Sequence, residues 1–390
     1  MREKLSHKYL KKIQSSLRIA FFAVFLSGIQ SCEESFLDVV PDNVATVDQA
    51  FNLRNEAEKY LFTCYAYIPK NGDGIYNIAM LAGDEVWIPG QDAAINSFAF
   101  DIARNLQRVS NPYLDAWEGR YQAAGPADLY PLFDGIRHCN IFLENLQDET
   151  RVPDISLAER QRWISEAKFL KAYYHYYLMR MYGPIPIIKS VIPIDASEAE
   201  LQVAREPIDE SVNYLVELLD EAITALPPQI TDRQNELGRI TKPIALGIKA
   251  ELLLMAASPL FNGNADMAGF NTKEGTPLFN TSFDELKWKR AADAAKEAID
   301  VAEANGARIF YKEDISFDIS DTTKTKLNIR QAVTERWNDE IIWANPNSRT
   351  YELQRLVMPP LASDVYHSQA RKVFSPTIES AQMFYTKNGV

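Results

Sequence analysis

The chain has 390 residues, of which 46% are hydrophobic and 24% are charged, and its formal net charge at pH 7 is −12. A chain of this length and apolar content can bury a large core, in one large domain or two ordinary ones. Because nucleic acids and anionic membrane faces bind basic patches, this acidic balance argues against both as partners.

The first 31 residues have the layout of a secretory signal peptide. Six basic side chains precede an apolar run at 19–26, and small or polar residues lead from there to Cys32. The run has roughly half of the ~20 residues that a bilayer-spanning helix needs, so it is no stable anchor by itself. Because residues 1–31 carry six basic side chains and one acidic side chain, their removal would take the net charge to −17.

Cys32 is the expected site of lipid attachment. Residues 29–32 (IQSC) resemble a bacterial lipobox, in which the cysteine is lipidated and becomes the new N-terminus. An ordinary signal peptide that ends near a cysteine is the alternative. Each buried acyl CH₂ contributes about 0.8 kcal/mol, and two or more chains hold a protein durably at a membrane. Glu33 and Glu34 follow, either as a solvated linker or as an acidic cluster similar to the export signal of Bacteroidetes surface lipoproteins.

Apolar residues then recur at helical spacing along most of the chain. Helices are expected at about 51–67, at 131–146, from Ser156 to Gly183-Pro184, from Pro207 to Pro227-Pro228, from Thr241 to Ser258-Pro259, and along a stripe with Trp288, Ala292, Ala295, Ile299 and Ala302. Proline marks several of these ends because it lacks an amide donor. Small alanines on helix faces allow close pairing, as in helical-hairpin solenoids, although no literal repeat is present. The predicted fold class is mainly α.

The helix that begins at Ser156 shows the clearest local signals. The spacing of Ser156 to Glu159 predicts a capping box, in which two backbone donors are satisfied reciprocally. The tyrosine-rich run 173–177 (YYHYY) is expected to be mostly core. Because five successive residues cover every side of a helix, at least one of these tyrosines should reach a surface or an interface.

Few segments of the sequence are predicted to be strands. Residues 185–193 are short, apolar and rich in proline, which favours an extended connector. Long polar or mixed segments at 70–112, 262–282 and 312–338 are expected to interrupt the helices. Loops of that length in a compact body are often binding surfaces.

Cys64 and Cys139 lie in apolar helical patterns, where a free cysteine behaves as a small hydrophobic residue. An exported compartment would permit a disulfide between them, and the sequence leaves that question open. His138 and His175 also fall within predicted helices, and we expect both to be structural.

Catalytic and metal-binding motifs are missing from the sequence. It holds neither HExxH nor GxSxG, and no metal-type spacing of cysteine and histidine. Asp84 and Glu85 are adjacent, whereas glycoside hydrolysis needs two carboxylates on either side of one bond. Residues 262–266 resemble the start of a calcium-binding EF-hand loop, but Met267 and Lys273 stand where glycine and glutamate are needed. We therefore predict no metal, no cofactor and no enzyme activity.

Sugar binding needs aromatic faces, because one face of a pyranose is apolar, and polar side chains for its hydroxyl rim. A tryptophan in a loop is more suggestive of such a platform than one on a helical stripe. The first candidates are Trp87, Tyr76 and Asp84, and the second are Trp337, Tyr351, Asn345 and Arg349. The other tryptophans of the body outside segment 338–348, Trp117, Trp163 and Trp288, are expected in the core.

Five segments, in order along the chain, resemble SusD/RagB-type lipoproteins. They are FLDVVPDNVAT (36–46), GIRHCNIFLENL (135–146), EAKFLKAYYHYYLMRMYGPIPII (166–188), GRITKPIALGIKAELLLMAASPLFNGN (238–264) and NDEIIWANPNS (338–348). The resemblance spans nearly all of residues 32–390, and each segment alone is only moderately specific. Members of this family usually continue well past a segment like 384–389, so the resemblance implies that part of the C-terminal half is missing.

The resemblance implies a binding protein tethered to the outer membrane through Cys32, with its body facing the cell exterior. It would capture oligosaccharides and act as the lid of a SusC-like TonB-dependent transporter. Its scaffold would be tetratricopeptide-like helical hairpins, with long loops forming the ligand face. No motif fixes the ligand residues in this family.

Other functions stay open beside glycan capture. RagB-like members capture oligopeptides, which would need a longer, more polar cleft with groups that pair with a peptide backbone. A secreted hydrolase would need converging carboxylates in a concave pocket. A protein that serves only as a helical scaffold would lack any concave aromatic patch.

Overall fold

The computed structural model describes residues 47–71, 83–87, 98–108, 110, 112, 115–118, 131–312, 319–346, 357 and 375–384. The predicted signal peptide, Cys32 and segment 36–46 lie outside these residues. By its internal contacts the chain divides into a unit of residues 1–49 and a unit of residues 50–390, and the elements below belong to the second unit apart from the start of η2. Within the described residues, no helix is both long enough and apolar enough to cross a membrane.

The described chain is mainly α-helical, as the sequence predicts. Its longer helices are α2 (Arg54–Tyr65), α5 (Leu132–Gln147), α6 (Leu157–Tyr182), α8 (Ile208–Ile223), α9 (Lys242–Ala257), α10 (Glu285–Ala304) and α11 (Asp321–Thr334). The shorter ones are η2 (Asp48–Phe51), α4 (Phe98–Ala103), α7 (Glu198–Leu201), η3 (Ala265–Met267) and α13 (Ile378–Gln382). Strands β1 (Val86–Trp87) and β2 (Ser375–Pro376) form one short antiparallel pair.

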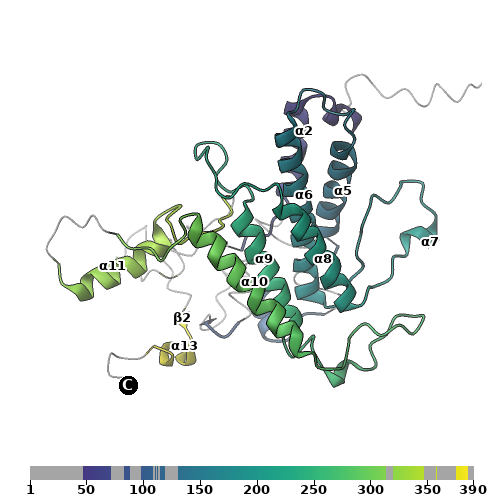
Figure 1. The fold of residues 1–390 in the computed structure, drawn as a ribbon. Helices are drawn as coiled ribbons and strands as arrows, with labels where there is room; N and C mark the ends of the chain where they lie inside the picture. The colour runs from purple at the N-terminus through teal and green to yellow at the C-terminus, as the bar shows by residue number, and fades with distance from the viewer. Residues whose placement is uncertain are drawn as a thin grey trace, which may run out of the picture. The chain divides into compact units, whose positions relative to one another are not determined.

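Helix α6 is the centre of the core. It packs against α2, α5, α8 and α9, and successive helices pair as α5 with α6, α8 with α9, and α9 with α10 (Figure 1). All four tyrosines of the 173–177 run are buried, none more than 5% exposed. The expectation that one of them reaches a surface or an interface is therefore wrong, because neighbouring helices, Trp343 and the segment after α6 cover this part of the helix.

The ends of α6 follow their local signals, with one exception. Ser156 caps the N-terminus by accepting a hydrogen bond from the Glu159 amide, and Gly183 ends the helix with a φ of 69°. The reciprocal half of the predicted capping box is wrong. The Glu159 carboxylate instead accepts hydrogen bonds from the Arg54 guanidinium of α2, with Nε to Oε1 at 3.0 Å. The bond to Arg54 pairs two opposite charges and uses both carboxylate oxygens, whereas the local bond would join the carboxylate to a neutral amide.

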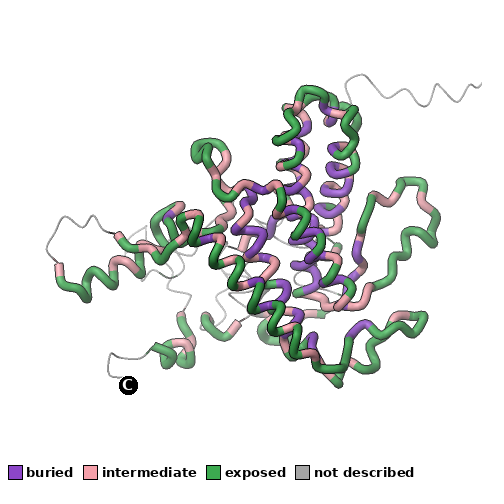
Figure 2. The backbone as a smooth tube through the Cα atoms, viewed as in Figure 1, coloured by how far each residue is buried: buried purple, intermediate pink, exposed green. Residues whose placement is uncertain are grey.

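Helices α8 and α9 begin where proline and threonine predict. Pro207 and Thr241 occupy their N-cap positions, although neither side chain makes a capping hydrogen bond. The predicted stripe on α10 is confirmed at Ala302, which is buried, but it is wrong at Trp288, which is 42% exposed, and at Ile299, which is 56% exposed. Ala291 and Ala294 are buried in place of these larger residues, on a helix that packs against α9. Figure 2 shows buried residues concentrated on α6, α8 and α9, whereas α10 is largely exposed.

A helix, α11, occupies most of the segment predicted as a loop at 312–338. Ser320 caps it by accepting from the Thr323 amide. None of its residues is buried, so the apolar periodicity that reveals a packed helix is weak there. The local cap was the only strong signal for this helix.

The segment 185–193 is extended without being a strand, as predicted. Its backbone is held by buried side chains of α5 and α6 in place of a neighbouring strand. Asn140 donates to the carbonyls of Ile188 and Ser190, and His175 Nε2 accepts from the Ile188 amide at 3.1 Å. His175 is therefore structural, as expected.

The cysteines and all but one of the tryptophans expected in the core pack there. Cys64 and Cys139 are both buried and free, so no disulfide joins them in this structure. Trp163 is buried, and Trp117 packs edge-on against Phe133 and Tyr182, as expected of core residues. Trp288, exposed on α10, is the exception.

Candidate functional site

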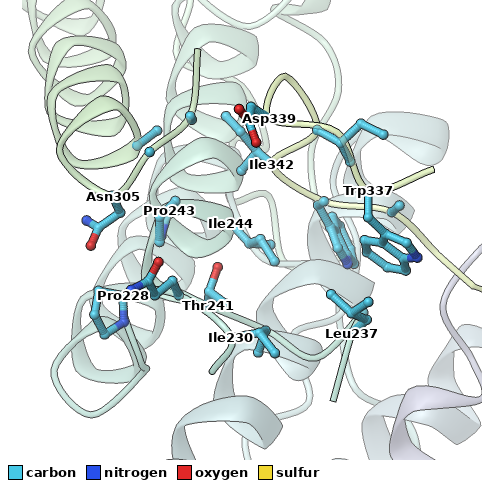
Figure 3. Close-up of a pocket in the computed structure, with 18 of the residues that line it drawn as sticks. Pro228, Ile230, Leu237, Thr241, Pro243, Ile244, Asn305, Trp337, Asp339 and Ile342 are labelled. Atoms are coloured by element: carbon cyan, nitrogen blue, oxygen red, sulfur yellow. The ribbon is translucent and has the colours of Figure 1, made fainter. Parts of the chain in front are cut away.

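A pocket lies between the chain that connects α8 to α9, the C-terminal end of α10, and the segment 337–344 (Figure 3). Its volume is about 170 Å³. In the view of Figure 3, Asn305 and Trp337 lie on opposite sides of the pocket, with Thr241 and Ile244 between them. Small-molecule pockets commonly hold about 300–1,000 Å³, so this one fits a single unit of a longer ligand.

Trp337 is presented by a strained turn. Its φ is 56°, a left-handed conformation that is an outlier for a bulky side chain. Asn338 holds the turn in place: its Nδ2 donates to the carbonyls of Ala332 and Glu335, and its Oδ1 accepts from the Glu340 amide. Backbone strain of this kind costs about 1–3 kcal/mol and clusters at functional sites.

Buried ion pairs hold the side of the pocket next to the core. Arg239 is buried and its guanidinium bonds Glu166 of α6, with Nη2 to Oε2 at 3.0 Å. Glu166 is fully buried and also accepts from Tyr65 and Arg162, so its charge is satisfied. A buried carboxylate without such partners would be costly. The pocket is thus built against a closed network of ion pairs.

Two close approaches fix the segment that carries Trp337. Trp343 packs edge-on against Phe169 and Tyr173 of α6, with ring centroids 5.6 Å and 5.1 Å apart. Gly238 has a φ of 99°, and a Cβ added there would lie 2.9 Å from Pro346 Cδ. Position 238 therefore requires glycine both for its conformation and for the passage of the chain beside it.

The polar side chains of the pocket differ in how many of their hydrogen-bonding groups already have a partner. Thr241 is 7% exposed, and within the described part of the chain its hydroxyl makes no hydrogen bond. Asn305 donates from Nδ2 to the Val301 carbonyl at 2.7 Å, which leaves its amide oxygen to accept. Asp339, the one acidic side chain among the described lining residues, bonds Arg308 at 2.9 Å.

The structure places the predicted site residues in separate regions. Trp337 lines the pocket, and Asn345 directly follows the lining residue Ala344. Trp87 lies on β1, is 39% exposed and has the Arg104 guanidinium 5.3 Å from its ring centroid. Asp84 is exposed, and its carbonyl accepts from the Thr377 hydroxyl at 2.6 Å. Neither Trp87 nor Asp84 lines the pocket. Tyr76, Tyr351 and Arg349 lie outside the described residues.

Sequence reasoning missed the contribution of the connection between α8 and α9. It supplies Gln229, Arg233, Leu237 and Thr241 to the pocket. The available signal was its length, which far exceeds the ~2–8 residues of typical connections between bundle helices.

Within the described residues, no group of three or more histidine, cysteine, aspartate or glutamate side chains could hold a metal ion. Asn262, the first residue of the EF-hand-like stretch, instead exchanges two hydrogen bonds with the backbone of Asp284. His138 Nδ1 lies 2.9 Å from the Tyr60 hydroxyl, and its pKa is lowered by burial.

Comparison with known families adds to this geometry. Residues 35–254 match a family model for SusD-like proteins, described as starch-binding and associating with the outer membrane. The match covers more than half of the chain. The chain belongs to the SusD/RagB family.

Solved structures agree on the fold. A structure named BT4246 is 27% identical with a TM-score of 0.70, covering 86% of this chain and 57% of that one. A SusD-like protein from Bacteroides fragilis is 17% identical, with a TM-score of 0.56 over 87% of this chain and 53% of that one. Surface glycan-binding protein A from Bacteroides thetaiotaomicron, solved with laminarihexaose, is 13% identical, with a TM-score of 0.53 over 86% of this chain and 62% of that one.

The chain spans a little over half the length of these solved SusD-like structures. No curated protein matches the sequence. The two likenesses at 17% and 13% identity establish a shared helical fold and nothing further about ligands.

Proposed function

We propose that this SusD-like chain is a surface lipoprotein that binds oligosaccharides and delivers them to a SusC-like TonB-dependent transporter, for which it acts as a lid. Cys32 would carry the lipid that anchors it to the outer membrane, with the body facing outward. The family match supports binding at the outer membrane. The observation that carries a glycan ligand is the pocket with Trp337 at its side.

The chemistry of the pocket suits a sugar. The half-buried indole of Trp337 offers an apolar surface for the C–H face of a pyranose, and the Thr241 hydroxyl and Asn305 amide oxygen can meet hydroxyls at its rim. Because the Thr241 hydroxyl makes no hydrogen bond within the described residues, it can bond a sugar hydroxyl without breaking an existing contact there. Trp87, partly exposed on β1, is proposed as a second contact for a longer chain.

The pocket favours binding over catalysis. Glycoside hydrolysis uses two carboxylates that flank the scissile bond. Among the lining residues that the structure describes, Asp339 is the only carboxylate, and it is engaged by Arg308. We therefore propose no enzyme activity for this site.

The test is a binding screen of the full chain against arrays of glycans and peptides, with Trp337→Ala and Trp288→Ala variants. Trp288 is the matched control because it is an exposed tryptophan outside the pocket. We expect binding of one class of glycan, weakened more than about tenfold by Trp337→Ala, because a tryptophan at the centre of an interface commonly contributes 2 kcal/mol or more. Trp288→Ala should bind as the wild type does.

Peptide binding with no glycan signal would contradict the glycan proposal and assign the chain to the oligopeptide-capturing branch of the family. Glycan binding that Trp337→Ala leaves intact would move the site away from this pocket. The same screen on Trp87→Ala then decides whether β1 carries it.

A further inference from the structure

We propose that the Trp337 pocket selects saccharides that carry an anionic group, a carboxylate or a sulfate ester, and that Arg233 binds this group. The inference rests on the proposed glycan-binding function and adds the chemical class of the ligand. It depends on where Arg233 lies and on how the acidic groups around it are engaged.

Arg233 is exposed, lines the pocket, and is tied to the segment that carries the aromatic platform. Its Nη2 donates to the Trp337 carbonyl at 3.4 Å, so the guanidinium is held beside the residue proposed to stack on the sugar. A guanidinium has five N–H donors, and within the described residues this is the only hydrogen bond that Arg233 makes. The remaining donors can bind a ligand.

The acidic residues within three positions of Arg233 in the sequence, and the acidic lining residue Asp339, have other partners. The Asp232 carboxylate accepts from the amides of Gln234 and Asn235 and from the Asn235 side chain. The Glu236 carboxylate bridges two other guanidinium groups of the network next to the pocket, those of Arg162 and Arg239. Asp339 pairs with Arg308, with Nε to Oδ2 at 2.9 Å.

Within the part of the chain that the structure describes, Arg233 is therefore the lining residue whose charge has no ion-pair partner. The other lining arginine, Arg239, is buried and bonded to Glu166. No described carboxylate lies within ion-pair distance of Arg233, although the chain as a whole is strongly acidic, with a net charge of −12. An exposed cation that no described carboxylate neutralises, beside an aromatic platform in such a chain, points to an anionic ligand.

The geometry of the three groups matches an acidic sugar residue. A planar guanidinium binds a carboxylate or a sulfate through two parallel N–H···O bonds, which are charge-assisted and about twice as strong as neutral ones. With the ring on the Trp337 indole, a single unit would fill the volume of about 170 Å³. The hydroxyl of Thr241, which lies between Asn305 and Trp337 in the view of Figure 3, would form a hydrogen bond with a ring hydroxyl.

The experiment compares the full chain with its Arg233→Gln, Arg233→Lys and Arg290→Gln variants on three sets of oligosaccharides: neutral, uronate-bearing and sulfated. Arg290→Gln is the matched control, because it removes the same charge from an exposed arginine that bonds an amide, Asn213, near the start of α10. Ala302, at the pocket end of α10, lies about 18 Å farther along the helix axis. Binding is measured at low and high salt.

We expect uronate-bearing or sulfated chains to bind, with affinity reduced about tenfold or more by Arg233→Gln, reduced less by Arg233→Lys, and unchanged by Arg290→Gln. Added salt should weaken wild-type binding and have little effect on the remaining binding of Arg233→Gln. The set that binds distinguishes a carboxylate from a sulfate.

Anionic binding that Arg233→Gln and Arg290→Gln affect equally would overturn the inference. Binding of neutral glycans alone would also overturn it, while leaving the proposed glycan function in place. The absence of binding to all three sets by the wild type would contradict the glycan function itself, and the inference with it.

Discussion

His175 shows how one buried side chain fixes a connection and sets a pH limit. It is fully buried on α6; Nδ1 donates to the Lys171 carbonyl at 2.8 Å and Nε2 accepts from the Ile188 amide at 3.1 Å. Only the neutral ring can make both bonds, since a protonated ring has no acceptor. Burial lowers the pKa of His175 to about 3, and the nearby Lys171 charge adds to this.

This histidine should make folding depend on pH on the acidic side. In the unfolded chain it takes up a proton below its ordinary pKa of about 6.5, whereas in the folded chain it stays neutral down to about pH 3. The contribution is therefore complete above about pH 6.5 and declines as pH falls, by up to about 1.4 kcal/mol per pH unit.

The test compares the wild type with His175→Gln, which keeps one donor and one acceptor but does not titrate. The variant should be less stable at pH 7.5, because the ring packing is lost, and its stability should fall less steeply from pH 6 to pH 4. Urea unfolding at each pH measures both, and carboxylate titration cancels in the difference. Parallel pH profiles for the two proteins would show that His175 is not the responsible group.

At the scale of elements, helix packing depends on where small residues lie. In α5, a Cβ added at Gly135 would meet Tyr67 Cβ and Cγ at 2.9 Å and Tyr174 Cε2 at 3.1 Å. In α9, a Cβ added at Gly247 would meet nothing within 4 Å. One glycine is thus needed for a close approach, whereas the other only reduces helix propensity.

The same substitution should have opposite effects in these two helices. Gly247→Ala should raise the free energy of unfolding by about 0.5–1 kcal/mol, the usual gain in helix propensity. Gly135→Ala should lower it by about 1–3 kcal/mol, because the methyl group displaces Tyr67 near its own backbone. Urea unfolding of both variants at one pH checks this, and a stabilising Gly135→Ala would mean that α5 is packed less tightly than the structure shows.

At the scale of the whole molecule, the negative net charge disfavours attachment to an anionic membrane, whereas the proposed lipid favours it. A net charge near −17 after loss of residues 1–31 disfavours attraction to anionic membrane lipids. The proposed attachment therefore depends on the lipid at Cys32, because a hydrophobic anchor acts independently of the charge of the protein.

Substitution of Cys32 should release the protein from the membrane. Cys32→Ala should take up no labelled palmitate in growing cells and should leave the membrane fraction, because no acyl chains would hold it. Cys64→Ala is the matched control, since Cys64 is a buried free thiol of the core, and it should keep the label. Labelled Cys32→Ala protein would refute lipidation at this position.

Structural features that depend on a few neighbouring residues could be predicted from the sequence. The Ser156 cap, the Gly183 stop and the prolines around α8 and α9 act locally, so these helices lie close to their expected bounds. The register of α10 could not be predicted, because alanine and tryptophan both fit an apolar stripe and only the close approach of α9 selects the alanines. Exposed α11 lacked any such stripe.

The sequence by itself determined the helical fold class, the family, and Trp337 as a candidate, since a tryptophan outside a helical stripe is unusual. The tertiary structure alone decided that the connection between α8 and α9 meets the end of α10 and the Trp337 turn in one pocket. It also decided which charges are engaged: among the described residues Arg233 pairs with no carboxylate, whereas Arg239 is bonded to Glu166. The reason is physical: local signals report the conformation of neighbouring residues, whereas a pocket is made by residues that are about 100 positions apart, such as Arg233 and Trp337.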